Sequence, residues 1–585
     1  TNTGDLRIAG TVEGRVQNAA GAELRLSQGS RVSGPVSNAG TLSGTGRIDG
    51  ALGNAGTAVL GGSVGAVTNT GRLEVAGNLS AAAVSNAGEA VVGAGDALSV
   101  SGTLRNSGDL SVGGRVTAAG GITNVEDGRM VLDGAQIAAD VTNAAGARLD
   151  IVSDSSVTGN LVNRGTIDLI GQAEQVRLSV QDGSFTNSGV VQVSGAGFLT
   201  IEADEILLQA GSVVDNARVQ LLGAVSNGGE LTFGRDTALE GDLRNGPDGS
   251  VTIAARIDGA GRDIINGGTL TVGGADRPGR VTGLDQLVNS GTVTVGAGSV
   301  IGARQISNAE GGDLTVAGSI TGAVENAAGG TIRLADGTVS GSLRNEGALS
   351  GTGRVTGTLT NRGTAAIGGG VGRIDNAGQL TTQGDLTAGR LDNGGTTTVR
   401  ADDRLTVAET VVNGGQLRVL GVLDGSVLGG GALLGNGTIT GAVESRGRMD
   451  WSGRIDGRLL NAGTASLSGQ VGGALRNEGQ LQLSGDLSVG GVLRNVGGDA
   501  AGPAAAAPGG ATLQVGRGQT LSAAGGIVNE AGADLTNDGR IAATIDNRGT
   551  YRQTGTLAGS LASRGEAFVL GAVTGDLDFV SGRLT

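Results

Sequence analysis

Charged side chains that could do chemistry gather in two places in this sequence. Glu202, Asp204 and Glu205 lie within a strongly aliphatic segment, and carboxylates at this spacing could serve acid–base catalysis or hold a cation. The run 402–404, Asp-Asp-Arg, is the nearest approach to a mixed acidic and basic catalytic cluster. Nothing around either group supports catalysis. We therefore interpret the first as longer repeat units with a solvated acidic turn, and the second as an exposed turn.

Other reactive residue types are missing from the composition. The chain has no histidine and no cysteine, so it lacks the usual base of a nucleophilic triad, the commonest metal ligands and any disulfide. It also has no lysine, which excludes a phosphate-binding loop of the G-x-x-x-x-G-K-[ST] form. The glycine-rich calcium nonapeptide is not convincingly repeated. We predict a protein that is not an enzyme, with no catalytic, cofactor-binding or metal site.

The net charge and the hydropathy of the chain limit the classes of partner that we expect. The 41 basic residues, all arginine, stand against 55 acidic ones, giving a net charge of −14. Nucleic acid is an unexpected partner for such a chain, because affinity for phosphates comes from clustered positive charge. No apolar run of about 18 residues appears, and Thr1 opens without a basic and then apolar leader. We expect no direct membrane insertion and no export signal within this chain.

The composition also restricts the core. The chain contains 117 glycines, five prolines and only 1% aromatic residues, while 38% of its residues are hydrophobic. Collagen needs glycine at every third position, and plain disorder would deplete the aliphatic residues. With so few aromatic side chains, the core must be thin and aliphatic.

A short phrase repeats along the chain: asparagine, one or two small residues, glycine, any residue, then an aliphatic one. Successive intervals are near 17 or 18 residues and drift, as 54−38 = 16 and 106−86 = 20 show. Serine replaces the asparagine at Ser445, Ser563 and Ser581. The phrase begins at Asn38, Asn54, Asn69, Asn86, Asn106, Asn163, Asn187, Asn266, Asn289, Asn361, Asn376, Asn461, Asn477 and Asn547.

Alternating aliphatic residues follow many of these phrases, as at Leu73 and Val75 or Leu110 and Val112. Alternation with period two indicates a strand with one buried face. A repeat of about 18 residues cannot bury that face alone, so neighbouring repeats must stack. We predict an all-β fold: a single elongated parallel β-helix, or β-solenoid, of about 30 coils with roughly 18 residues per coil. It would run continuously over 1–585 and extend for about 150 Å.

The repeated phrase suggests its own turn. Glycine would supply a positive φ at a sharp corner, and asparagine tolerates the left-handed conformation while bonding nearby backbone. The asparagine amides could also bond one another from coil to coil as a ladder. The drift in period could instead put some of them out of register, and both alternatives stay open at this stage.

The segment 497–511 interrupts the rhythm with a proline- and glycine-rich stretch around four consecutive alanines. Proline and glycine there cannot continue a strand ladder, so we predict a flexible loop extruded from one corner. Its lack of charged or aromatic residues favours a spacer.

The run 104–112, Leu-Arg-Asn-Ser-Gly-Asp-Leu-Ser-Val, resembles the passenger regions of Gram-negative autotransporter adhesins, a style shared by filamentous haemagglutinin-like secreted proteins. The likeness covers nearly the whole chain. It implies a structural extracellular stalk, displayed at the outer-membrane surface and active in adhesion, aggregation or biofilm formation. The partners would be a host or neighbouring-cell surface, or the protein itself, associating end to end or side by side.

An alternative resemblance is to the bactofilins, polymer-forming solenoids whose coils also contain Gly-x-Val-x-Gly, as at 353–357. It implies a self-assembling filament or scaffold subunit. Bactofilins are usually far shorter chains, which favours the adhesin resemblance.

Overall fold

The computed structural model describes residues 1–214, 218–274, 277–497 and 510–585. These residues form parallel strands and no helix, divided between two compact units, Thr1–Arg304 and Gln305–Thr585. Both units are parallel β-solenoids, and together they comprise about 31 turns of roughly 18 residues. The predicted fold class is confirmed. That a single solenoid continues over 1–585 stays a prediction.

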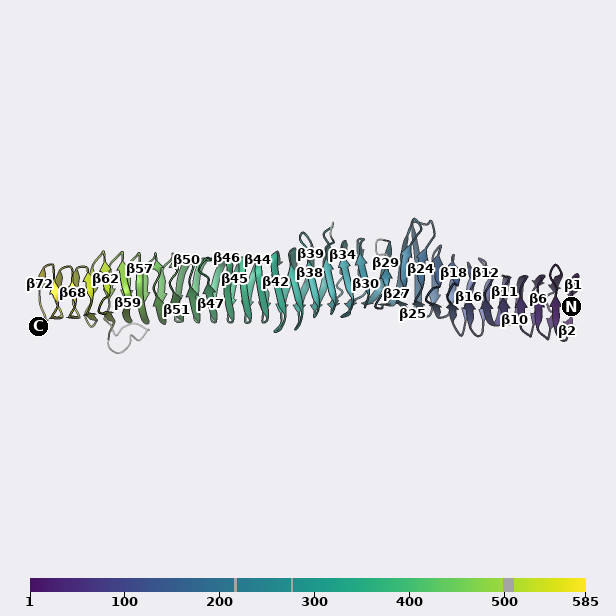
Figure 1. The fold of residues 1–585 in the computed structure, drawn as a ribbon, viewed down its shortest axis with the longest axis horizontal. Helices are drawn as coiled ribbons and strands as arrows, with labels where there is room; N and C mark the ends of the chain where they lie inside the picture. Colours follow the sequence, from purple (N-terminus) through teal and green to yellow (C-terminus); the bar gives the residue numbers. More distant parts are fainter. Residues whose placement is uncertain (215–217, 275–276, 498–509) are drawn as a thin grey trace. The chain divides into compact units, whose positions relative to one another are not determined.

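In the first unit each turn typically has three short strands, and each strand pairs with its equivalent in the next turn. Within the unit, successive turns lie side by side and the sequence advances steadily along the stack (Figure 1). Two consecutive turns consist of β12 (Glu89–Val92), β13 (Ala97–Val100) and β14 (Leu104–Asn106), then β15 (Asp109–Val112), β16 (Arg115–Ala118) and β17 (Ile122–Asn124).

The second unit repeats this plan, and in both units some turns merge their strands. The merged strands bend at register shifts instead of breaking. They include β10 (Thr57–Asn69), β11 (Arg72–Asn86), β25 (Gln175–Asn187), β27 (Phe198–Leu208), β44 (Ala348–Asn361), β45 (Thr364–Asn376) and β46 (Gln379–Asn393).

The core is a column of aliphatic side chains inside each stack. Leu110 of β15 pairs with Ala90 in the preceding turn and with Met130 in the following turn. All three are at most 4% exposed. The alternation read from the sequence, with Leu110 and Val112 inward, is confirmed because both are buried while Ser111 between them faces outward.

A second column inside each unit consists of asparagine side chains at strand ends, which we call the asparagine ladder. Asn54 donates from Nδ2 to Asn69 Oδ1 at 2.6 Å and accepts from Asn38 Nδ2 at 2.7 Å. Its Nδ2 also donates to the carbonyl of Arg72 at 2.9 Å, one turn ahead. The ladder, open at the sequence level, therefore forms. Its uninterrupted runs are Asn2 to Asn187 and Asn227 to Asn289 in the first unit, and Asn308 to Asn413 and Asn461 to Asn547 in the second.

The drifting repeat length does not break the ladder. Bonded asparagines are 15 residues apart at Asn361–Asn376, 24 apart at Asn163–Asn187 and 34 apart at Asn495–Asn529. The strand ends therefore keep their register although the segments between bonded asparagines differ in length. Within the predicted loop 497–511, residues 498–509 lie outside the described part of the chain.

The sequence interpretation of the turn was right that asparagine bonds nearby backbone, as Asn69 Nδ2 does to the carbonyl of Gly71 at 3.1 Å, but it was wrong about the backbone conformation. Gly56 and Gly71, which are typical glycines of the repeated phrase, do not have a left-handed φ, and neither do the described asparagines. Gly582, in the last phrase of the chain, does have a positive φ (101°). Glycine is needed because a Cβ on Gly71 would collide with the carbonyl oxygen of Gly56, the equivalent glycine one turn earlier. Positive φ occurs instead in longer turns that follow other ladder asparagines, as at Gly21 (φ 76°) and Gly146 (φ 80°).

Two of the three serines that were expected to replace asparagine do so. Ser445 pairs with Asn461, and Ser563 Oγ accepts from Asn547 Nδ2 at 3.0 Å. The prediction for Ser581 was wrong, because the residue in register with Ser563 is Phe579. The strand there ends earlier than the phrase suggests.

Replacing one ladder asparagine should destabilise the second unit. In Asn361→Ala, Asn345 Nδ2 loses its acceptor at residue 361 and Asn376 Oδ1 loses its donor. Because both are buried polar groups, the free energy of unfolding should fall by about 2–4 kcal/mol. Urea unfolding followed by circular dichroism measures the loss. Asn436→Ala, at an exposed asparagine outside the ladder, is the matched control and should unfold as the wild type does. Equal midpoints for the two variants would contradict the role of the ladder.

Two glycines of the first unit provide a second test. Gly71→Ala forces a Cβ against the carbonyl of Gly56 and should cost about 1–3 kcal/mol. Gly53→Ala, where no atom lies within 4 Å of the added Cβ, should change stability by less than about 0.5 kcal/mol. Thermal unfolding of the two variants compares them directly. If Gly71→Ala melts with the wild type, the steric explanation of the phrase fails.

Candidate functional site

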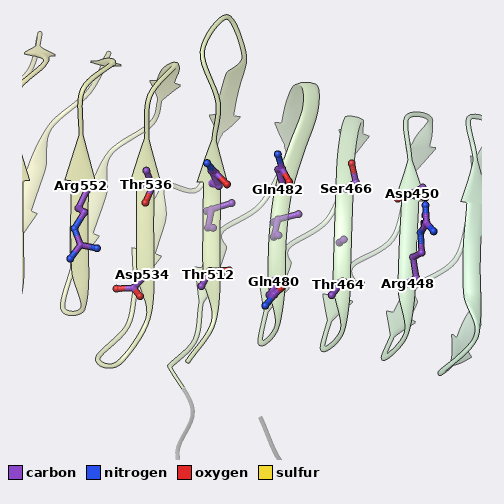
Figure 2. Close-up of a pocket in the computed structure, with 14 residues that line it drawn as sticks. Arg448, Asp450, Thr464, Ser466, Gln480, Gln482, Thr512, Asp534, Thr536 and Arg552 are labelled. Carbon is purple, nitrogen blue, oxygen red and sulfur yellow. Dashed lines mark hydrogen bonds and ion pairs between the residues drawn. The ribbon is translucent and has the colours of Figure 1, made fainter. Parts of the chain in front are cut away.

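A surface trough of about 570 Å³ lies in the second unit, across the first strands of six successive turns. Figure 2 shows these strands side by side with the lining side chains. The strands are β54 (Arg448–Trp451), β57 (Thr464–Val471), β59 (Gln480–Val489), β61 (Thr512–Val515), β64 (Asp534–Asn537) and β67 (Thr550–Gln553).

Strand register arranges the outward side chains of the trough in two rows. The first outward position of each strand forms one row and the third position forms the other, as Figure 2 shows. The first row is Arg448, Thr464, Gln480, Thr512 and Asp534, and the second is Asp450, Ser466, Gln482, Gln514, Thr536 and Arg552. Neighbouring members of a row are about 4.8 Å apart along the stack.

The middle of both rows is neutral and available for binding. Thr464, Ser466, Gln480, Gln482, Thr512, Gln514 and Thr536 line it. Among the described residues, none of these side chains makes a hydrogen bond within the chain. Their amides and hydroxyls can both donate and accept, so they can bind a partner or water.

Charged residues lie only towards the two ends of the trough. Arg448 pairs with Asp450 on the same strand, and both are partly exposed. At the other end the Arg552 guanidinium lies 5.5 Å from the centre of the Phe568 ring, and Asp534 lies one turn before it. Two arginines and two aspartates leave the trough without net charge.

The spacing of the two carboxylates does not suit glycoside hydrolysis. Asp450 and Asp534 are separated by four strand steps, which is about 19 Å along the stack. Paired glycosidase carboxylates lie within about 10 Å of each other. The arrangement supports binding across the trough and provides no acid–base pair.

The only tryptophan and the only tyrosine of the chain lie beneath the ends of the trough, both pointing inward. Trp451 of β54 is 3% exposed, and its Nε1 has no hydrogen-bond partner in the described structure. Tyr551 of β67 is fully buried and donates from its hydroxyl to Gln553 Oε1 at 2.8 Å. Burial raises the pKa of the Tyr551 phenol to about 12.

The acidic group near residue 202 lies within one long strand. Glu202, Asp204 and Glu205 all belong to β27, whose pairing shifts register between Glu202 and Glu205. The bend therefore occurs inside an unbroken strand, which corrects the expected turn. Glu202 accepts from Arg177 at 3.1 Å and from Ser179 Oγ at 3.0 Å, while the other two carboxylates are exposed.

Asp402 lies where it was expected, at an exposed turn, while Asp403 after it is half-buried and Arg404 begins β48 (Arg404–Asn413). Asp403 accepts hydrogen bonds from Thr382 Oγ1 at 2.6 Å and from the Gly384 amide at 3.1 Å, both in the preceding turn. This carboxylate therefore holds two turns together. Arg404 lies 3.6 Å from Asp424, in an exposed ion pair.

The first unit contains a buried ionic cluster that the sequence analysis did not identify. Asp150 and Asp168 are at most 1% exposed although they occupy the outward third position of β21 (Arg148–Ile151) and β24 (Thr166–Leu169). Arg148 pairs with both carboxylates, and Asp168 also accepts from the Ser194 amide and hydroxyl at 2.8 and 2.7 Å. The hydrogen bonds of Asp168 are used within the protein, so the cluster is structural.

In the parts of the chain that the structure describes, no three or more aspartates and glutamates gather in a way that could hold a metal ion. Those same parts contain no helix long and apolar enough to cross a membrane.

The trough was not predicted from the sequence. The pattern in the sequence that could have indicated the trough is three polar triplets, each following a repeated phrase or the 497–511 insertion. They are Thr-x-Ser at 464–466, Gln-x-Gln at 480–482 and Thr-x-Gln at 512–514. That these triplets share one face depends on pairing across the insertion, where Gln480 lies beside Thr512.

Comparison with known proteins adds no relative: no protein-family model matches the chain, and no curated protein matches it by sequence.

Because Tyr551 is the only tyrosine, its ionisation can be followed directly by absorbance near 295 nm. The native protein should titrate near pH 12, against about 10 for the unfolded chain. The raised native pKa means that the unfolded state binds fewer protons above pH 10, so stability should fall from pH 10 to 12. A native midpoint near 10 would contradict burial of this side chain, and Tyr551→Phe removes the signal as a control.

Proposed function

We propose that this chain is a structural, non-catalytic stalk element of a secreted or surface-displayed adhesin of a Gram-negative bacterium. The observation that carries the proposal is the division of side chains in both units. Turn after turn, inward positions are used by the aliphatic column and the asparagine ladder, and only outward positions remain for partners. Each unit therefore presents a repetitive outer surface.

The proposal is supported by how the turns are held together. Backbone hydrogen bonds run between successive turns, and charged side chains add contacts along the same direction. Arg373 pairs with Asp375 on its own strand at 2.8 Å and with Asp392 in the next turn at 2.7 Å. Such exposed pairs contribute little each, about 0–1 kcal/mol, so stiffness would come chiefly from the backbone and the buried columns.

The site of action rests on the resemblance to autotransporter passenger regions. The repeated phrase followed by Leu-x-Val supports export and surface display. The net charge of −14 suits a protein that must stay soluble outside the cell. Host or neighbouring-cell surfaces are the proposed partners.

Surface display is tested with antibodies raised against the purified chain. We expect them to label intact cells of the source bacterium, and labelling that requires permeabilised cells would contradict the proposal. Electron microscopy of the purified protein is the second measurement. Separate particles of one fixed length agree with a stalk, whereas indefinite end-to-end filaments would favour the bactofilin-like scaffold.

A further inference from the structure

We infer that the trough across β54, β57, β59, β61, β64 and β67 binds an unbranched, uncharged polysaccharide laid along the stack of turns. This inference rests on the proposed adhesin function and names the class of ligand that the trough would take. It is carried by the neutral hydrogen-bonding side chains of both rows, which have no partner in the described structure.

The hydrogen-bonding inventory matches a hydroxyl-rich polymer. Gln480, Gln482 and Gln514 each offer an amide that donates and accepts, and Thr464, Ser466, Thr512 and Thr536 add hydroxyls. A sugar hydroxyl also donates and accepts, so it can bond to either kind of side chain. Since the groups lie in two rows, the ligand can be contacted from both sides of its length.

The charge distribution favours an uncharged ligand. Asp450 is already paired with Arg448, so this end of the trough attracts neither cationic nor anionic ligands strongly. At the other end Asp534 and Arg552 lie on adjacent strands with opposite signs. A sulfated or carboxylated polymer would meet no cluster of cations over the neutral middle rows.

An extended peptide fits the trough less well than a polysaccharide. Peptides that bind to sheets usually add a strand to a free edge or bury apolar side chains in pockets. The six strands are paired on both sides, so their backbone groups are used within the stack. Ala465, Leu481 and Leu513 beneath the rows are at most 6% exposed and offer no apolar pocket.

The length of the trough sets the binding mode. Contacts recur about every 4.8 Å over six turns, so a long, extended ligand gains more than a single sugar. Because each contact replaces a hydrogen bond to water, a single trough should bind its ligand weakly, with a Kd on the order of 1 mM. Many copies displayed on one cell would bind a polysaccharide surface through avidity.

Isothermal titration calorimetry of the full chain tests the inference. The probes are uncharged linear hexasaccharides of β-1,4-glucose, α-1,4-glucose, β-1,4-mannose and β-1,4-N-acetylglucosamine, with heparin hexasaccharide and hexagalacturonate as charged counterparts. We expect at least one uncharged probe to bind and both charged probes to bind at least tenfold more weakly.

The double variant Gln482→Ala/Gln514→Ala should weaken that binding about tenfold. The matched control, Gln136→Ala/Gln181→Ala, removes two exposed glutamines of the first unit and should stay within twofold of the wild type. All four positions face solvent, and circular dichroism confirms that both double variants keep the β-solenoid.

Absence of binding by all four uncharged probes overturns the inference, as does tighter binding of a charged probe or equal affinity of the two double variants. Sedimentation velocity tests whether a second copy of the chain occupies the trough instead. If the wild type self-associates and Gln482→Ala/Gln514→Ala does not, while no saccharide binds, the trough belongs to a second copy and the inference is wrong. Surface labelling of intact cells is independent of these results, so the proposed function can stand when the inference fails.

Discussion

The structure depends on one requirement: along each run of the asparagine ladder, the buried side-chain amides must be hydrogen-bonded. Each ladder asparagine, such as Asn54, donates to the next asparagine and to a backbone carbonyl one turn ahead, while its oxygen accepts from the preceding asparagine. Any slip in register would leave several amides unsatisfied at once. The ladder thereby fixes the alignment of strands whose connections vary greatly in length.

The same alignment explains the unusual composition. Backbones at equivalent corners approach so closely that a Cβ on Gly71 would collide with the carbonyl of Gly56, so many turns need glycine at this corner. Alanine takes the equivalent position in turns with a longer corner, as at Ala22 and Ala147. The narrow interior takes Leu, Val and Ile in stacked rows and has little room for aromatic rings. Where a large ring does lie inside, as at Tyr551, it is completely buried and its hydroxyl is bonded to Gln553.

Outward positions are free of these requirements, and the chain uses them in different ways. In the first unit, Asp150 and Asp168 are buried by their surroundings and tied to Arg148, so that outward face is structural. In the second unit, Gln482 and Gln514 remain exposed and unpaired in the trough. A repetitive scaffold can thus carry local binding surfaces without any change to its interior.

The sequence by itself determined the fold, because alternation at Leu110 and Val112 and the recurring asparagine phrase are local patterns that only stacked turns can bury. It also indicated that Asp402 lies at an exposed turn. It could not decide how the corner glycines act, or that Phe579 and not Ser581 takes the ladder register, because both depend on contacts with the preceding turn. The trough, too, was decided only by tertiary structure. Gln480 and Thr512 are 512−480 = 32 residues apart in the chain and become neighbours through strand pairing. Side chains that face solvent follow no periodic pattern in the sequence, so the sequence does not indicate which of them will lie side by side.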